Sequence, residues 1–202
     1  MSEDRTTLDL WFDPLCPWAW MTSRWALEVA KVRAVDVQFH VMSLSALNEG
    51  RELPSGYREL MDKAWSGARV ALAVQANHPD KLTDFYTALG TRLHPGGQPN
   101  DRTAHAAALA EAGLPTELAT AGDSDEADDA LRAANAEVAE QVGTDVGTPV
   151  IRVNGMSLFG PVISPAPKGE EAGRLWDGFL NVLAYPGFFE LKRSRTVDPI
   201  FD

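Results

Sequence analysis

The sequence predicts an α/β fold in which an all-helical insertion separates two parts that both contribute strands. Residues 8–12 form an apolar run before a proline-flanked turn and a segment of helical spacing, and residues 35–44 alternate with a period of two. Near the other end, an Asn-Gly pair at 154–155 separates two short apolar runs, which is typical of a β-hairpin. The region between is rich in alanine and poor in strand formers, so it predicts helices.

The composition of the chain limits its possible functions. The 202 residues are 45% hydrophobic, as in a folded globular protein, and the formal net charge of −11 argues against binding to nucleic acid or anionic membranes. We expect no membrane span and no signal peptide, hence a cytoplasmic protein. One cysteine permits no internal disulfide, and the four histidines lack zinc-ligand spacing, so no metal site is expected. No glycine-rich nucleotide loop is present.

The first part of the chain reads as strand, helix and strand. The helix begins with Pro17, which suits a first helical position. Its apolar face is formed by residues at helical spacing, namely Met21, Trp25, Val29 and Val32. The second strand, at 35–44, places His40 on its more polar face, where we interpret it as structural.

Helical spacing dominates residues 54–122. Breakers at 94–97 and 113–115 divide this region into several helices, the last of them a short one at 117–121. A region this long is not an ordinary connection between two elements, so we interpret it as an insertion.

The last part reads as helix, hairpin and helix. Ser124 followed by acidic residues predicts a helix start, and the surrounding acidic cluster is interpreted as a solvated face. That helix ends near Gly143, and the final helix is expected at 169–184. The tail is interpreted as a solvated terminus, with a phosphate or carboxylate patch as the alternative. Its basic residues are Lys192, Arg193 and Arg195.

Without the insertion, the predicted order of elements is that of a thioredoxin fold. An insertion before the second half gives the DsbA-like arrangement. We expect residues 1–50 to form the first half (βαβ), 51–123 the helical insertion, and 124–202 the second half (αββα) with the C-terminal tail.

Cys16 is the leading candidate for a catalytic residue, because it lies where the first strand turns into the first helix. Unpaired backbone N–H groups and the positive end of the helix dipole favour a thiolate at such a position, so we expect a lowered thiol pKa. The alternative is a buried cysteine that packs as a small hydrophobic residue. The strand, the sharp turn and the helix together favour the catalytic interpretation.

Longer segments of the chain are similar to a known family. Several segments resemble the DsbA-like thioredoxin superfamily. They are Trp-Phe-Asp-Pro-Leu-Cys-Pro-Trp at 11–18, Gly-Thr-Pro at 147–149, Val-Asn-Gly at 153–155 and Phe-Gly-Pro at 159–161. The likeness runs nearly end to end, through segments such as 23–25, 31–33, 39–44, 169–173 and 188–192. On these residues the chain resembles the actinobacterial mycothiol-dependent nitroreductase family.

The active-site motif departs from that of redox-active members. They carry Cys-Pro-Trp-Cys, whereas this chain has Cys16, Pro17, Trp18 and Ala19. Ala19 is either a natural monothiol variant or an engineered change that traps a mixed disulfide. In both cases Cys16 forms no internal disulfide with position 19, so a dithiol cycle cannot run in this chain.

The resemblance implies mycothiol as reductant or co-substrate, with no tightly bound cofactor. The Cys16 thiolate would attack a disulfide, an electrophile or a mycothiol adduct. A second small thiol or a separate reducing redox protein would then release the adduct. Nitroaromatic or disulfide substrates follow from the same resemblance, while no oligomeric state follows from the sequence.

Further site residues are expected around the thiol. In the resembling fold, Pro149 is a cis proline that faces the nucleophile and presents the backbone of Thr148 to a thiol ligand. Trp18 either covers the site and an aromatic substrate or packs in the core. Asn48 and Tyr57 lie where the insertion would cover the site. They either hold a sugar, carboxylate or nitro oxygen, or serve as a turn residue and a packed aromatic.

Three functions therefore compete. The leading hypothesis is a thiol-dependent oxidoreductase. The second is a transferase or isomerase similar to kappa-class glutathione transferases and hydroxychromene carboxylate isomerases, which use one residue at the Cys16 position to activate a bound thiol. The third is a binding domain that has lost redox function through Ala19, which the intact Cys16, Pro17 and Trp18 disfavour.

Overall fold

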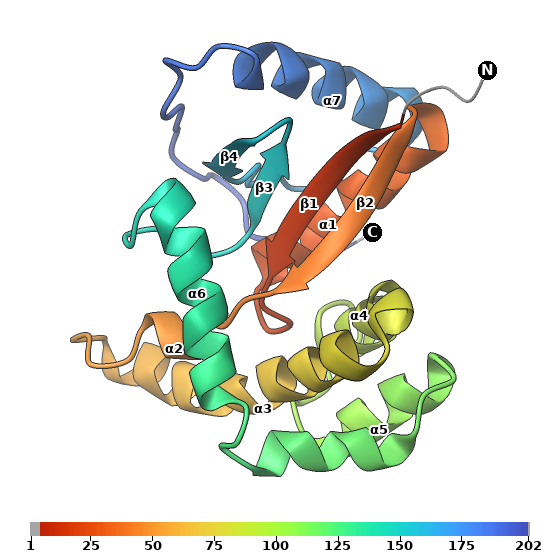
Figure 1. Cartoon of the computed structure of the whole chain (residues 1–202), viewed down its shortest axis with the longest axis vertical. Coiled ribbons are helices and arrows are strands. Elements are labelled where there is room, and N and C mark those ends of the chain that lie inside the picture. The colour runs from red at the N-terminus through yellow and green to blue at the C-terminus, as the bar shows by residue number, and fades with distance from the viewer. Residues whose placement is uncertain (1–4, 202) are drawn as a thin grey trace.

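One mixed sheet organises the chain (Figure 1). The structure is a computed structural model that describes residues 5–201; residues 1–4, on which the expectation of no signal peptide partly rests, and residue 202 lie outside the described residues. The strands lie in the order β2-β1-β3-β4. Their bounds are β1 (Thr6–Phe12), β2 (Val35–Val41), β3 (Val150–Val153) and β4 (Met156–Phe159). β1 is parallel to β2 and antiparallel to β3, which pairs antiparallel with β4. The predicted thioredoxin-like sheet is confirmed.

Two helices pack together against one face of the sheet, α1 (Pro17–Val32) and α7 (Gly169–Leu183) (Figure 1). The indole N–H of the fully buried Trp25 in α1 donates to the carbonyl of Ala172 in α7 at 3.1 Å. Its ring centroid lies 6.2 Å from that of Trp176. Removing these large apolar rings from water is the main force that joins α1 to α7.

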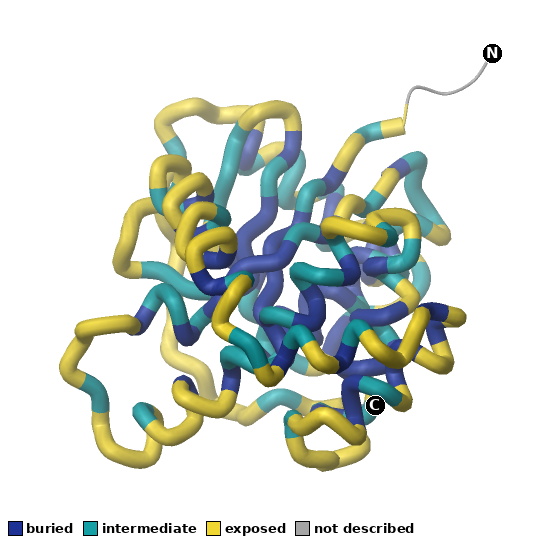
Figure 2. The backbone as a smooth tube through the Cα atoms, turned by 60° about the horizontal axis from the view of Figure 1, so that its bottom comes forward, coloured by how far each residue is buried: buried dark blue, intermediate teal, exposed yellow. Residues whose placement is uncertain are grey.

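The opposite face of the sheet is covered by α6 (Asp128–Val142). Side chains alternate along a strand, so Trp11 of β1 points away from its neighbours Leu10 and Phe12. Trp11 forms a small separate cluster with Met42, Val138 of α6 and Val150 of β3. The centre of the sheet is therefore buried on both faces, as Figure 2 shows by the buried stretches that run through the middle of the molecule. The edge strands are more open, since Asp36 and Gln38 of β2 and Phe159 of β4 are exposed.

The insertion consists of helices only. Its elements are α3 (Ser55–Asn77), the 3₁₀ turn η1 (Pro79–Lys81), α4 (Leu82–Leu93), α5 (Arg102–Glu111) and the 3₁₀ segment η2 (Thr116–Asp123). Tyr86 of α4 stacks on Phe12 at the end of β1, with ring centroids 3.7 Å apart, and meets Trp20 of α1 edge-on. This packing places the insertion against the end of the sheet from which Cys16 follows. We propose that residues 1–50, 51–123 and 124–202 are the three organisational units of the chain.

Several predicted boundaries need correction. The second strand ends at Val41 rather than at residue 44, because Ser43 caps the short helix α2 (Leu44–Leu47) and accepts a hydrogen bond from the backbone of Ala46 at 3.2 Å. Residues 117–121, predicted as an α-helix, lie in the 3₁₀ segment η2.

The start of α6 also differs from the prediction. Ser124 does not cap this helix, since its hydroxyl accepts from the backbone of Glu126 at 3.2 Å within the preceding turn. The acidic cluster is not wholly solvated either, because Asp128 is only 8% exposed. Its two carboxylate oxygens accept hydrogen bonds from the Arg69 guanidinium at 2.7 and 2.9 Å, which ties α6 to α3.

Within the described part of the chain, no helix is long and apolar enough to cross a membrane. Among the same residues, no group of three or more His, Cys, Asp or Glu side chains is placed to hold a metal ion.

The close approach of α1 and α4 gives a test of the fold. A Cβ added to Gly90 would lie 2.2 Å from the Trp20 ring, so Gly90→Ala must displace the helix that carries the Cys16 motif. Overpacking of this kind typically lowers the free energy of unfolding by about 1–3 kcal/mol. Urea denaturation measures the effect.

The matched control is Gly178→Ala in α7, where an added Cβ meets nothing within 4 Å. Its free energy of unfolding should rise by about 0.5–1 kcal/mol, because alanine favours a helix over glycine. Equal effects of the two substitutions would contradict the packing of Trp20 on Gly90.

Candidate active site

Cys16 is the N-cap residue of α1. Its sulfur accepts a hydrogen bond from the backbone N–H of Ala19 at 3.4 Å, and Pro17 occupies the first turn of the helix. The side chain is only 5% exposed. The turn that the sequence predicts between strand and helix therefore places the thiol among the unpaired N–H groups at the start of α1.

The loop before β3 faces the sulfur. The Thr148–Pro149 peptide bond is cis, as the family resemblance implies. The Cys16 thiol donates to the backbone carbonyl of Thr148 at 3.3 Å. The Thr148 hydroxyl is buried and has no hydrogen-bond partner among the described residues, so it remains free to donate to a thiolate. Residues separated by 132 positions thus form one site.

Asp13 fixes the turn that precedes the thiol. One carboxylate oxygen accepts from the backbone N–H of Leu15 at 2.8 Å and the other from that of Leu44 at 2.6 Å. The side chain is fully buried, and burial raises its pKa to about 6, although these two hydrogen bonds oppose the rise. Asp13 was not predicted as a site residue, although a carboxylate before a proline-flanked turn is a signal for such a role.

The expected lowering of the Cys16 pKa is wrong for this structure. Burial raises the pKa of the Cys16 thiol above its ordinary value, because a thiolate loses solvation in the interior. The Thr148 hydroxyl, which is free to donate to a thiolate, and the backbone N–H groups of Ala19 and Trp18 oppose this effect, whereas the negative charge of Asp13 adds to it. The N–H groups at the start of the helix lower the thiol pKa as predicted, but desolvation raises it by more.

Trp18 lines a cavity of about 610 Å³ beside the motif. The other residues around this cavity are Pro17 and the C-terminal residues Arg195, Thr196, Val197, Asp198 and Pro199. Trp18 is half-buried, and the guanidinium carbon of Arg195 lies 5.0 Å from its ring centroid. The indole therefore joins the core on one side and bounds an open space on the other, so neither alternative for Trp18 describes it alone.

Asn48 and Tyr57 approach the site from the insertion side. Asn48 ends α2 and is buried, and its side-chain amide donates to the carbonyl of Leu44 at 2.8 Å. Tyr57 lies in the first turn of α3 and is 39% exposed. Burial raises the pKa of the Tyr57 hydroxyl, the charge of Cys16 adds to the rise, and a hydrogen bond from Asn48 opposes it. The contact with the Leu44 carbonyl gives the Asn48 side chain a capping role at the end of α2.

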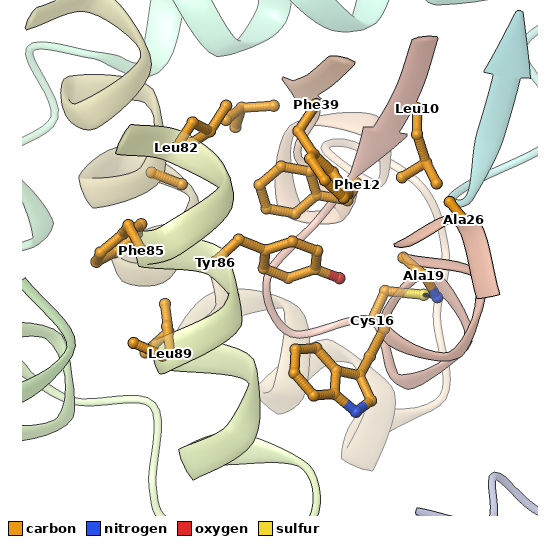
Figure 3. Packing of buried hydrophobic residues seen from close by; sticks show 14 of the residues in the cluster. Leu10, Phe12, Cys16, Ala19, Ala26, Phe39, Leu82, Phe85, Tyr86 and Leu89 are labelled. Carbon is orange, nitrogen blue, oxygen red and sulfur yellow. Dashed lines mark hydrogen bonds between the residues drawn. The ribbon is translucent and has the colours of Figure 1, made fainter. Parts of the chain in front are cut away.

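A second buried hydroxyl points toward the site. Figure 3 shows the Tyr86 side chain with its oxygen directed to the region of Cys16 and Ala19. This hydroxyl has no hydrogen-bond partner among the described residues. Burial raises its pKa above the ordinary range, so it stays a neutral donor. From the sequence alone, only helical spacing marks Tyr86, because the tertiary structure is what brings α4 to Cys16.

Two other residues have structural positions. Ala19 is fully buried, and its side chain brings no second thiol to Cys16. His40 stacks on Trp11, with ring centroids 4.7 Å apart, and its ring nitrogen lies 2.7 Å from a carboxylate oxygen of Asp9. These contacts agree with the structural interpretation of His40.

Known proteins with similar sequences identify the family. Residues 15–193 match the Rv2466c-like family, described as mycothiol-dependent nitroreductase Rv2466c. The uncharacterized protein Rv2286c of Mycobacterium tuberculosis (strain ATCC 25618 / H37Rv) is 30% identical over 195 residues, which cover 95% of this chain and 83% of that protein.

Solved structures share the fold at lower identity. DsbA of Mycobacterium tuberculosis in its oxidised form is 18% identical, with a TM-score of 0.55 over 93% of this chain and 88% of that one. The cytosolic disulfide reductase DsbM of Pseudomonas aeruginosa with GSH is 17% identical, with a TM-score of 0.56 over 87% and 99%. A 2-hydroxychromene-2-carboxylate isomerase is 11% identical, with a TM-score of 0.60 over 88% and 96%.

These matches agree with what the residues show. A DsbA-like thioredoxin fold carries a cysteine at the start of its first helix, opposite a cis proline. Family and fold together support a thiol-dependent oxidoreductase. Because the family match spans most of the sequence and includes this motif, the chain belongs to the Rv2466c-like family of mycothiol-dependent nitroreductases.

Proposed function

We propose that this chain is a monothiol oxidoreductase that uses mycothiol through the nucleophile Cys16. The observation that carries the proposal is the position of the sulfur, held between the N–H groups at the start of α1 and the cis Thr148–Pro149 loop. The family supports mycothiol as the small thiol partner. A cytoplasmic location belongs to the same proposal, because low-molecular-weight thiols stay reduced there.

The residues around the sulfur would serve the two forms of the thiol in turn. The carbonyl of Thr148 accepts a hydrogen bond from the neutral thiol at 3.3 Å. Once the thiol loses its proton, the backbone N–H of Ala19 and the free hydroxyl of Thr148 stabilise the thiolate. The thiolate attacks a disulfide sulfur of the substrate, forms a mixed disulfide with Cys16, and releases the other sulfur as a thiolate.

A second thiol must complete the cycle, because Ala19 offers none. Mycothiol attacks the mixed disulfide on Cys16, which regenerates the free thiol and releases a disulfide. For a nitroaromatic substrate, one mycothiol and Cys16 supply two electrons: the nitro group becomes a nitroso group, water forms, and Cys16 is left joined to mycothiol. The next mycothiol restores Cys16 and leaves as mycothiol disulfide.

We also propose roles for the neighbouring residues of the site. Pro17 and Trp18 bound the approach to the sulfur, and Thr148 and Pro149 present backbone to an extended thiol ligand. Tyr57, a partly exposed residue in the first turn of α3, would donate a hydrogen bond from its hydroxyl to substrate. Asn48 would hold Tyr57 in place.

A transferase or isomerase is the second candidate. The absence of a second thiol at the buried Ala19 favours it, because such enzymes activate a bound thiol with a single residue. Intact mass after exposure to mycothiol disulfide separates the two functions. A stable adduct on Cys16 supports the oxidoreductase, whereas binding without an adduct supports the transferase.

Substitutions at the motif test the proposed cycle. Cys16→Ser should abolish turnover of mycothiol with a nitroaromatic or disulfide substrate, because the hydroxyl is a far weaker nucleophile. Ala19→Cys should permit an internal disulfide with Cys16, so that one intermolecular step becomes intramolecular. Steady-state rates should then depend less steeply on mycothiol concentration. Full activity of Cys16→Ser, or an unchanged thiol dependence in Ala19→Cys, would overturn the oxidoreductase.

The electrostatics of the site give a pH test. The Cys16 pKa is raised by burial, so the rate of alkylation by iodoacetamide should reach its midpoint above the ~8.5 of an ordinary cysteine. Asp13→Asn removes a nearby negative charge and should lower that midpoint. Thr148→Val replaces the hydroxyl donor by a methyl group of similar size and should raise the midpoint. A wild-type midpoint below ~8.5, or shifts of the same sign in both variants, would show that desolvation and these two groups do not control the thiol.

A further inference from the structure

The C-terminal residues build one wall of the cavity beside the motif. We define the strap as residues 195–199, which line the cavity of about 610 Å³ together with Pro17 and Trp18. This volume falls in the range of roughly 300–1,000 Å³ that small-molecule sites occupy. Two residues that directly follow the nucleophile therefore share one space with a segment almost 180 positions away.

A single hydroxyl holds the strap in place. The Ser164 side chain donates to the backbone carbonyl of Asp198 at 3.1 Å and accepts from the backbone N–H of Ile200 at 2.8 Å. Both bonds involve the strap or the residue just after it. The side chains of the strap are thus positioned over the motif by backbone contacts that substitutions of those side chains leave intact.

The cavity wall is polar, and its formal charges cancel. Arg195 and Asp198 bring opposite charges, and Thr196 adds a hydroxyl. Among residues 5–201, no carboxylate lies within ion-pair distance of Arg195, whose guanidinium instead lies over the face of the Trp18 ring. Its N–H groups and the Asp198 carboxylate therefore stay open to a ligand that both accepts and donates hydrogen bonds.

An uncharged group with several hydroxyls fits this wall best. Each hydroxyl accepts from Arg195 or donates to Asp198, and the ring of Trp18 offers a flat apolar face to the carbon skeleton of a sugar or cyclitol. A carboxylate would meet the charge of Asp198, and an ammonium group that of Arg195.

We propose that the strap cavity binds the uncharged polyhydroxylated part of the thiol that reacts with Cys16, with Arg195 and Asp198 as specificity-determining residues. Mycothiol has such a part, since it joins an acetylated cysteine to a glucosaminyl-inositol. The inference rests on the proposed function for the use of this thiol, and it assigns the strap to recognition of the polyol.

The test compares two disulfides with the same reacting group. Mycothiol disulfide and the disulfide of N-acetylcysteine methylamide have the same uncharged amide beside the reacting sulfur and differ in the glucosaminyl-inositol. The rate at which each forms a mixed disulfide with Cys16 is measured by intact mass, without turnover. The wild-type protein should prefer mycothiol disulfide. Arg195→Gln and Asp198→Asn should each reduce the ratio of the two rates about tenfold, the effect of one lost charge-assisted hydrogen bond, and leave the rate with the disulfide of N-acetylcysteine methylamide unchanged.

Two further variants sharpen the result. Arg193→Gln makes the same change of charge two positions away, outside the cavity lining, and should keep the wild-type ratio. Ser164→Ala removes both backbone contacts of the strap and should lower the ratio as Arg195→Gln does. An unchanged ratio in Arg195→Gln and Asp198→Asn, or an equal loss in Arg193→Gln, overturns the inference.

Direct binding separates this inference from the proposed function. N-acetylglucosaminyl-inositol, in which an acetyl group replaces the acetylated cysteine and keeps the nitrogen an uncharged amide, is titrated into the wild-type protein and into Arg195→Gln by calorimetry. Binding to the wild-type protein that Arg195→Gln weakens supports the strap site even if Cys16 forms no adduct with either disulfide, a result that overturns the proposed function alone. Adduct formation without any binding of N-acetylglucosaminyl-inositol overturns the strap site alone.

Discussion

The buried carboxylate of Asp13 is the constraint on which the geometry of the site depends. Its two oxygens accept from the backbone of Leu15, in the turn before Cys16, and from that of Leu44, at the start of α2. One side chain therefore joins the exit of β1 to the segment that follows β2. These two N–H donors oppose the cost of burying a carboxylate, which is why the site tolerates a charge-bearing group beside its thiol.

The insertion does more than extend the fold, since its aromatic packing reaches the helix that Cys16 caps. Tyr86 stacks on Phe12 and meets Trp20 edge-on, while Gly90 lets the Trp20 ring approach the backbone of α4. A side chain at position 90 would push against α1. The orientation of α1, and with it the position of Cys16, is thus coupled to the packing of α4.

Most of the fold could be predicted from local patterns. The Pro17 start of α1, the Asn-Gly turn between β3 and β4, and the final helix α7 all lie where the sequence places them. The failures have local causes as well. Ser43 starts a helix inside the predicted second strand, and the Ser124 hydroxyl closes a turn rather than capping α6, because short polar side chains can bond to either backbone arrangement.

The candidate site follows from local sequence patterns to a smaller extent than the fold does. The sequence by itself determined where the thiol lies and which motif surrounds it, because a thiol at a strand-to-helix turn is a local arrangement. It also determined that position 19 is an alanine and offers no second thiol to Cys16. The contact of Cys16 with Thr148, the buried contacts of Asp13 and the approach of Arg195 to Trp18 join residues far apart in the chain, so only the tertiary structure decided them. The direction of the Cys16 pKa belongs to this second group, because it depends on burial, and the sequence shows the helix start without the protein atoms that exclude water from it.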